Sequence, residues 1–263
     1  MYTSGTTGNP KGVILTHRNV LSMFSAAMMI GIDIKPDDVH ISYLPLAHIL
    51  ERAVESALLC RGAAIGFFQG EIPKLFDDIA VLKPTLFVSV PRLFNKLYDK
   101  AMAKVEKDGG LTKMIFDFGL SSKKGNLDKG GEPISMVWDR VVFSKFRERL
   151  GGRVRLLLTG SAPISKEVHQ FLQICFSCPV LQGYGLTETS AAGAMTLPWD
   201  FNTGTNGPPI PSIEIALQDV PELKYLSTNE NPQGGYHLLE KVSFVQSNQL
   251  FIFRLLFQQK RCA

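Results

Sequence analysis

The chain has 263 residues, of which 45% are hydrophobic, and this is enough apolar material for one large domain or two subdomains. Its formal net charge of +4 is mild and its 28 basic residues are scattered, so it suits anionic small molecules or a membrane surface and gives no reason to expect nucleic-acid binding. Four cysteines, no secretory signal and no membrane-spanning run predict an intracellular protein without a disulfide framework.

The first distinctive stretch is residues 2–12, YTSGTTGNPKG, in which hydroxyl side chains alternate with glycines and a lysine follows a proline. Glycines let the backbone approach a ligand, so that N–H groups converge on phosphate oxygens, while hydroxyls and an ammonium group add donors. The stretch predicts a polyphosphate-binding loop, although its spacing differs from that of the common P-loop. The alternative is a flexible turn. The residues expected to contact phosphate are Thr3, Ser4, Gly5, Thr6, Thr7, Gly8 and Lys11.

Helix and strand patterns alternate after this loop. Thr16 is placed to cap a helix whose apolar positions run to Ile30, with Met23, Met28 and Met29 expected in the core. Strands are expected at residues 40–46, 63–68 (buried) and 85–90, and helices at 49–60, after Pro73 and at 91–107. This alternation predicts an α/β fold in which mostly parallel strands are joined by crossover helices.

The pattern breaks at residues 108–133, where polar and glycine-rich text predicts a partly mobile surface insertion. Its lysines are expected in a solvated loop, with contact to anionic lipid headgroups as the alternative. Beyond it, helices are expected at 136–150 and 165–175, and strands at 154–158 and 180–182. Cys175 and Cys178 have the spacing of a redox or metal pair, but they end a predicted helix instead of opening one, which favours a structural role.

Two short segments follow predicted strands, at the edge of a parallel sheet where ligands bind. Residues 159–163, TGSAP, are small enough for a flat ligand to approach the backbone. In residues 182–189, QGYGLTET, Tyr184 offers a ring face for stacking on a purine, and Glu188 offers a hard oxygen ligand for Mg²⁺ beside phosphates. Taken singly, the tyrosine is typical of an ordinary turn and the glutamate of a solvated charge.

In this order, the phosphate-loop string and QGYGLTET closely resemble the signature motifs of the adenylate-forming enzymes, a family that includes acyl-CoA synthetases, luciferases and peptide-synthetase adenylation domains. The strings YLPLAHILER (43–52), VSVPRLFNKLYDK (88–100) and RLLLTGSAPIS (155–165), together with the insertion, resemble the eukaryotic long-chain fatty acyl-CoA synthetases. The resemblance covers residues 2–234 and implies part of the large N-terminal domain of the adenylate-forming fold. It also implies a ligase that joins a long-chain fatty acid to coenzyme A through an acyl-adenylate, using ATP and Mg²⁺ and releasing AMP and diphosphate.

The resemblance further implies roles for single residues. Residues 3–8 and Lys11 would hold the β- and γ-phosphates of ATP, Thr3 and Glu188 would bind or orient Mg²⁺, and Thr187 would reach the α-phosphate. Thr3, Lys11, Thr187 and Glu188 are thus the expected catalytic residues. The expected walls of the adenine and acyl-adenylate site are Gly160, Ser161, Ala162, Gln182, Gly183, Tyr184 and Gly185. His48 is expected to help line this pocket, with a core histidine as the alternative.

The chain departs from the family at both ends. It starts one residue before the phosphate loop, and from about Gly235 its text lacks the family's ribose-binding aspartate, hinge and C-terminal lid domain. Residues 1–234 are therefore expected to form a partial AMP-binding domain, and 235–263 a poorly ordered tail. Weak or absent ligase activity is expected, because the lid excludes water and positions the reactants. The alternative is a non-catalytic nucleotide-binding or interaction fragment. Family members commonly lie on the endoplasmic reticulum or other organelle membranes, which implies peripheral membrane association.

Overall fold

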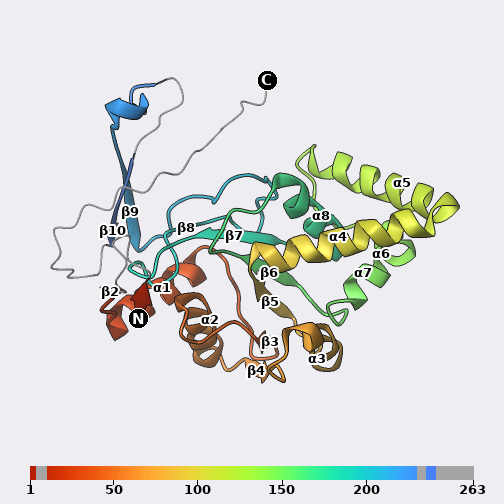
Figure 1. The fold of residues 1–263 in the computed structure, drawn as a ribbon, viewed down its shortest axis with the longest axis horizontal. Coiled ribbons are helices and arrows are strands. Elements are labelled where there is room, and N and C mark those ends of the chain that lie inside the picture. Colours follow the sequence, from red (N-terminus) through yellow and green to blue (C-terminus); the bar gives the residue numbers. More distant parts are fainter. Residues whose placement is uncertain (4–10, 230–234, 241–263) are drawn as a thin grey trace.

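A six-stranded sheet forms the centre of the protein in the computed structural model (Figure 1). The structure describes residues 1–3, 11–229 and 235–240. The strand order is β4-β3-β5-β6-β7-β8, and every neighbouring pair is parallel except β7 and β8. The strands are β3 (Val39–Ser42), β4 (Ala64–Phe67), β5 (Leu86–Ser89), β6 (Leu156–Thr159), β7 (Val180–Tyr184) and β8 (Ala194–Met195). The predicted α/β class with mostly parallel strands is confirmed.

Helices cover both faces of this sheet. They are α1 (His17–Met29), α2 (Ile49–Cys60), α3 (Leu75–Leu82), α4 (Pro91–Asp108), α5 (Gly110–Leu127), α6 (Met136–Val141), α7 (Ser144–Glu148) and α8 (Lys166–Phe176), with 3-10 turns η1 (Ile72–Lys74) and η2 (Pro221–Leu223). Successive side chains of a strand point to opposite faces. Phe87 and Leu157 therefore pack with α3, α4, α5 and α8, whereas Leu86 and Leu156 pack with α1 and α2. The sheet is the wall between two hydrophobic cores.

The first helix begins where its sequence predicts. The Thr16 hydroxyl accepts a hydrogen bond from the Asn19 N–H at 3.2 Å, and the Asn19 side chain accepts one from the Thr16 N–H at 2.9 Å, which makes a reciprocal cap. Met23 is buried as predicted. Met29, at the end of α1, is 73% exposed, so the prediction of a core position for Met29 is wrong.

Residues 108–133 hold the largest correction. Instead of a mobile surface loop, most of them form α5, whose inner face buries side chains at helical spacing. These buried residues are Phe116, Gly119, Lys123 and Leu127. The Lys123 ammonium group donates hydrogen bonds to the Asp139 carboxylate, to the Ile174 carbonyl at 2.6 Å and to Ser177 Oγ at 2.9 Å. These partners offset the cost of burying a charge, so a polar-looking segment folds as a helix against α8.

Two further predictions about single elements are wrong. The helix expected at 136–150 is broken into α6 and α7, because Phe143 between them turns into the core and packs 6.0 Å from the ring of Phe116. The strand β4 was expected to be buried, but it lies at the edge of the sheet and Phe67 is 75% exposed. Strand order, which local sequence does not encode, decides this burial.

The thiols of Cys175 and Cys178 are free and buried at the end of α8. Burial raises the pKa of both thiols, that of Cys178 to about 12, so neither is a thiolate at neutral pH. This environment agrees with the structural role predicted for the pair.

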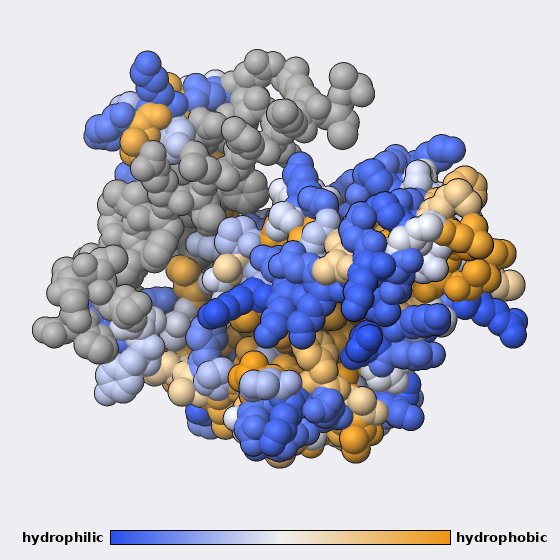
Figure 2. Space-filling model, turned by 45° about the vertical axis from the view of Figure 1, so that its right-hand side comes forward, coloured by the Kyte–Doolittle hydropathy of each residue, from blue (hydrophilic) through white to orange (hydrophobic). Residues whose placement is uncertain are grey.

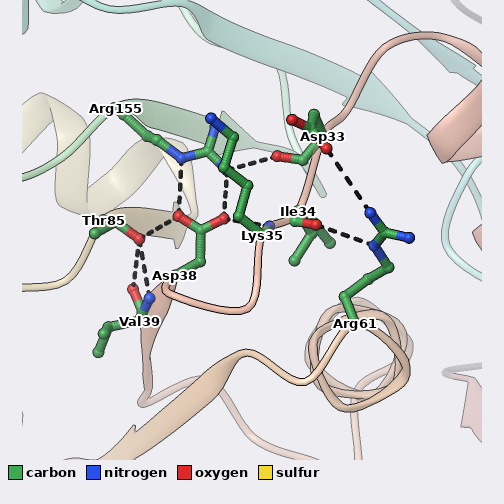
Figure 3. Close-up of polar contacts among 8 residues, drawn as sticks. All are labelled: Asp33, Ile34, Lys35, Asp38, Val39, Arg61, Thr85 and Arg155. Atoms are coloured by element: carbon green, nitrogen blue, oxygen red, sulfur yellow. Dashed lines mark hydrogen bonds and ion pairs between the residues drawn. The ribbon is translucent and has the colours of Figure 1, made fainter.

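A polar network closes the edge of the sheet at which the parallel strands begin (Figure 3). The carboxylate of Asp38, just before β3, pairs with Arg155, just before β6, and Arg155 Nε donates to Asp38 Oδ1 at 2.8 Å. The Thr85 hydroxyl, just before β5, donates to the same oxygen at 2.6 Å, and the Lys35 N–H donates to Oδ2 at 2.8 Å. One carboxylate thus joins the starts of three strands.

Two antiparallel pairs lie outside the central sheet: β1 (Tyr2–Thr3) with β2 (Lys11–Gly12), and β9 (Ile213–Gln218) with β10 (Gly235–Glu240). Residues 235–263 were expected to be poorly ordered, but the first six of them form strand β10, because β9 supplies partners for their backbone groups.

In the described part of the chain, no helix has the length and apolar character needed to cross a bilayer. Figure 2 shows apolar side chains gathered at the right-hand end of the molecule. The corner between α4 and α5 lies at this end in Figure 1.

Candidate functional site

The carboxyl ends of β3, β5, β6 and β7 lie at one edge of the sheet, because these strands are parallel. Residues 160–162 leave β6 at this edge, and Gln182 to Tyr184 end β7 beside them, with Thr159 and Gln182 in register. A Cβ atom on Gly160 would lie 3.6 Å from the Gly183 carbonyl oxygen and 4.0 Å from Leu50 in α2. The structure thus brings together segments that are far apart in the sequence.

His48 enters this edge from α2, as its N-cap residue. The Leu50 N–H donates to His48 Nδ1 at 3.2 Å. This bond places the ring proton on Nε2, which leaves an exposed N–H donor. The alternative of a core histidine is wrong, since His48 is exposed.

The turn after β6 is strained in a way that exposes small residues. Ser161 has φ +69°, a left-handed conformation that is uncommon for a residue other than glycine. Gly160 is buried, whereas Ser161 and Ala162 are exposed. Strained turns of this kind gather at ligand sites, and this one presents a thin, small-residue surface at the edge of the sheet.

The loop between β7 and β8 is compact and positions Tyr184, Thr187 and Glu188. A Cβ atom on Gly185 would lie 2.0 Å from the Ala191 carbonyl oxygen, so only glycine fits there. Tyr184 is half-buried and burial raises the pKa of its phenol, which keeps the ring neutral. Thr187 and Glu188 lie partly exposed within the turn that returns the chain to β8.

Several buried polar atoms at this edge have no protein partner among the described residues. They are Thr159 Oγ1, Gln182 Oε1 and Ser190 Oγ. The other end of the Gln182 amide donates to Asn206 Oδ1 at 2.9 Å, so the orientation of the free oxygen is set by that bond. A buried acceptor without a partner costs free energy, so a polar ligand that donates to it would stabilise the site.

Sequence reasoning missed three residues of this edge: Thr159 as a contact, Ser190 and Asn206. Thr159 stands inside the TGSAP string, and its position directly before Gly160 was the signal that could have included it. Ser190 and Asn206 do not belong to a recognisable motif. They reach this edge only because the chain after β7 folds back beside that strand.

The phosphate-loop residues divide into described and undescribed parts. Thr3 and Lys11 face each other across the β1–β2 pair, with Lys11 exposed. Ser4, Gly5, Thr6, Thr7 and Gly8 lie outside the described residues. No ion pair joins Lys11 to Glu188 within the part of the chain that the structure describes. A single pocket that includes the loop and the β6–β7 edge therefore stays a prediction.

The donors predicted for magnesium are sparse. Among the described residues there is no group of three or more histidine, cysteine, aspartate or glutamate side chains that could hold a metal ion. The Glu188 carboxylate and Thr3 hydroxyl are hard oxygen donors, which suit Mg²⁺ when phosphate oxygens complete its coordination. The donor set fits an ion that arrives with a nucleotide.

Residues 1–236 match the family described as AMP-binding enzyme. The chain is 48% identical over 230 residues to fatty acyl-CoA synthetase A of Dictyostelium discoideum, covering 88% of this chain and 34% of that protein. It is 47% identical to the peroxisomal long chain acyl-CoA synthetase 7 of Arabidopsis thaliana and 45% identical to human long-chain-fatty-acid–CoA ligase 1, covering 87% and 86% of this chain. The chain spans about a third of the length of these relatives, as the covered share of 32% shows for the last two.

Solved structures share the fold. The adenylation domain of a carboxylate reductase from Mycobacterium chelonae superposes with a TM-score of 0.68 at 26% identity, covering 92% of this chain and 33% of that one. O-succinylbenzoate coenzyme A synthetase from Bacillus subtilis, solved with ATP and magnesium ion, has a TM-score of 0.60 at 21% identity, covering 93% of this chain and 42% of that one.

Proposed function

Because this chain belongs to the AMP-binding enzyme family, we propose that it is the nucleotide-binding part of a long-chain fatty acid–CoA ligase. The reaction would convert a long-chain fatty acid, ATP and coenzyme A into acyl-CoA, AMP and diphosphate. Residues 1–234 would form the AMP-binding domain, and 235–263 a segment outside the family pattern. The named relatives, two of them long-chain acyl-CoA synthetases or ligases at 45–47% identity, support this substrate class.

The observation that carries the proposal is the meeting of residues 160–162 with Gln182, Gly183 and Tyr184 at one edge of the sheet. The glycines leave room for a flat base, the Tyr184 ring can stack on it, and the unpaired Gln182 oxygen can accept a hydrogen bond from its amino group. The edge therefore suits adenine in shape and in hydrogen bonding.

The charged part of the nucleotide would lie toward the phosphate loop. Lys11, Thr3 and the glycine-rich residues between them would neutralise the triphosphate, and Thr187 would reach the α-phosphate. Glu188 with Thr3 would hold Mg²⁺, which neutralises phosphate charge so that a carboxylate can approach. These residues position and neutralise charge, and no proton-transferring side chain is needed. His48, with its exposed Nε2–H, would donate to the bound acid or phosphate.

Nucleotide titration with the two charged residues altered tests this assignment. Glu188→Gln removes the metal ligand and Lys11→Ala removes the ammonium group, so each should weaken ATP–Mg²⁺ binding by roughly tenfold or more, measured by calorimetry. Glu222→Gln and Lys224→Ala, on the exposed η2 turn, are the matched controls and should bind like the parent chain. Equal affinity in all five proteins would exclude the site proposed for the phosphates.

A second measurement separates a ligase from a nucleotide-binding module. Diphosphate release that depends on both ATP and a long-chain fatty acid would establish the first step, and coenzyme A-dependent thioester formation the second. ATP binding with neither product would leave the binding module as the function. We also propose an intracellular setting, which the relative named as peroxisomal supports.

A further inference from the structure

The outer surface of α5 and α6 carries an unusual number of exposed apolar side chains. Seven large apolar side chains there are each at least 59% exposed. They are Leu111, Met114 and Phe118 of α5, Ile134, and Met136, Val137 and Val141 of α6, and together they define the α5–α6 face. Figure 2 shows apolar side chains gathered at this end of the molecule, with hydrophilic ones around them.

The geometry of α5 makes this face continuous. Leu111, Met114 and Phe118 follow one another at spacings of three and four, nearly opposite the buried stripe that contains Lys123. The Phe118 ring packs edge-on against Trp138 of α6, with centroids 5.5 Å apart, so the two helices present one surface. A helix that is apolar on its outer side as well as its inner side has a second surface to cover.

An open groove of about 660 Å³ borders the α5–α6 face at Phe118 and Ile134. Phe118 and Ile134 contribute its apolar walls, whereas Ser121, Ser122 and Lys129 contribute hydroxyl and ammonium donors. Apolar walls beside donors of this kind match the boundary between the acyl chains and the phosphate groups of a lipid.

The segment that contains the α5–α6 face carries more basic than acidic side chains. Residues 100–150 contain eleven basic and seven acidic side chains, and four lysines pair with five of the acids. Within this described segment, seven basic side chains and two acidic ones are left without an ion-pair partner. The unpaired group includes Lys107, Lys129 and Arg140, which are all exposed. Lys129 lines the groove with Phe118 and Ile134, and Arg140 belongs to α6. A second copy of this chain would bring like charges together, whereas an anionic surface would be attracted.

We propose that the α5–α6 face docks this protein on an anionic lipid bilayer. The apolar residues enter the boundary between headgroups and acyl chains, and the surrounding lysine and arginine side chains pair with lipid phosphates. The docking rests on residues 107–141, and it does not require the nucleotide site to be as proposed.

Vesicle cosedimentation of the full chain tests the docking. The chain should bind vesicles that contain phosphatidylserine, bind pure phosphatidylcholine vesicles at least about tenfold more weakly, and dissociate in high salt because salt screens exposed charges. Equal binding to both vesicles, or binding that salt does not change, would overturn the proposal.

Variants identify the surface. The triple change Leu111→Ser, Met114→Ser and Met136→Ser leaves the Phe118–Trp138 contact intact and should reduce binding by roughly tenfold or more. The matched control changes Leu59, Phe67 and Val81 to serine; these are as exposed but lie on α2, β4 and α3, and their loss should leave binding unchanged. Equal loss in both triple variants would mean that the face is not specific.

Two further triple variants test the role of the basic residues. Changing Lys107, Lys129 and Arg140 to glutamine should lower binding by about tenfold or more and flatten its salt dependence, whereas changing Arg18, Lys35 and Lys224 to glutamine should not. Far-UV circular dichroism and ATP titration on the same proteins should be unchanged, which separates this proposal from the nucleotide site. A dimer in analytical ultracentrifugation that the apolar variant abolishes, with no vesicle binding, would assign the face to self-association and overturn lipid docking.

Discussion

Asp38 is the residue on which the starts of three parallel strands depend. Its side chain is 2% exposed and accepts hydrogen bonds from Arg155, Thr85 and the Lys35 N–H. Burial by itself would raise its pKa, but the hydrogen bonds and the Arg155 charge outweigh burial, so the pKa lies below its ordinary value of 3.8. The ionised carboxylate is therefore the form that the fold stabilises.

This shift predicts how stability changes with pH. A group whose pKa is lower in the folded state contributes fully above its unfolded pKa and loses that contribution as pH falls through the folded pKa. We expect Asp38→Asn to destabilise the chain by about 1–3 kcal/mol near neutral pH and to reduce its loss of stability below about pH 4. Urea unfolding over this pH range measures both effects. Asp37→Asn, exposed and adjacent, is the control, and an unchanged pH profile in Asp38→Asn would contradict the role of the network.

At the scale of elements, a buried ion pair between Lys123 and Asp139 joins α5 to α6. Burial lowers the pKa of Lys123, and the hydrogen bond from its ammonium group to Asp139 opposes that decrease. The ammonium group also lies 4.7 Å from the centre of the Phe143 ring, between α6 and α7. Lys123 thus connects α5 to α6 and to the end of α8 through its three hydrogen bonds.

Removing one partner of this pair should lower the free energy of unfolding. Asp139→Ala leaves the Lys123 charge buried without compensation, and we expect a loss of about 3–5 kcal/mol in urea unfolding. Replacing both partners, with Lys123→Met and Asp139→Leu, should restore much of that loss because no charge remains buried. Asp117→Ala removes an exposed pair with Lys113 on the same helix and should have little effect. Equal small effects of Asp139→Ala and Asp117→Ala would show that the pair does not hold α5.

At the scale of the whole molecule, the two hydrophobic cores share one sheet. Phe87 stacks on Tyr43 and meets Phe94 edge-on in the first core, and Leu181 is buried in the second. Strands β5, β6 and β7 each supply side chains to both cores, so loss of packing on one face loosens strands that the other face needs. The central sheet should unfold as one cooperative unit.

Core truncation on either face tests this cooperativity. Phe87→Ala should cost about 3–5 kcal/mol and Leu181→Ala about 2–5 kcal/mol, because each leaves a cavity. In both variants the unfolding transitions followed by tryptophan fluorescence and by far-UV circular dichroism should shift together. Val81→Ala, at an exposed position, should leave the midpoint unchanged. Two separate transitions in either variant would show that the cores are independent.

The sequence by itself determined the local and compositional features of this protein. The alternation of strands and helices, the Thr16 cap, the extent of α2 and the small-residue strings after β6 and β7 depend on residues near one another in the chain, so local patterns predict them. Short sequence motifs were enough to predict the family, because a ligand-binding loop needs particular residues at particular spacings.

Only the tertiary structure decided which residues meet and which are buried. Lys123 reads as a surface charge until Asp139 and the Ile174 carbonyl are placed around it, and β4 reads as a core strand until it is placed at the edge of the sheet. The contact of Gly160 with Gly183, and the Gln182–Asn206 bond beside it, likewise depend on strand order. Contacts between distant parts of the chain decide which side chains are buried and which are paired. A short stretch of sequence cannot predict these contacts, because their free energy depends on residues outside that stretch.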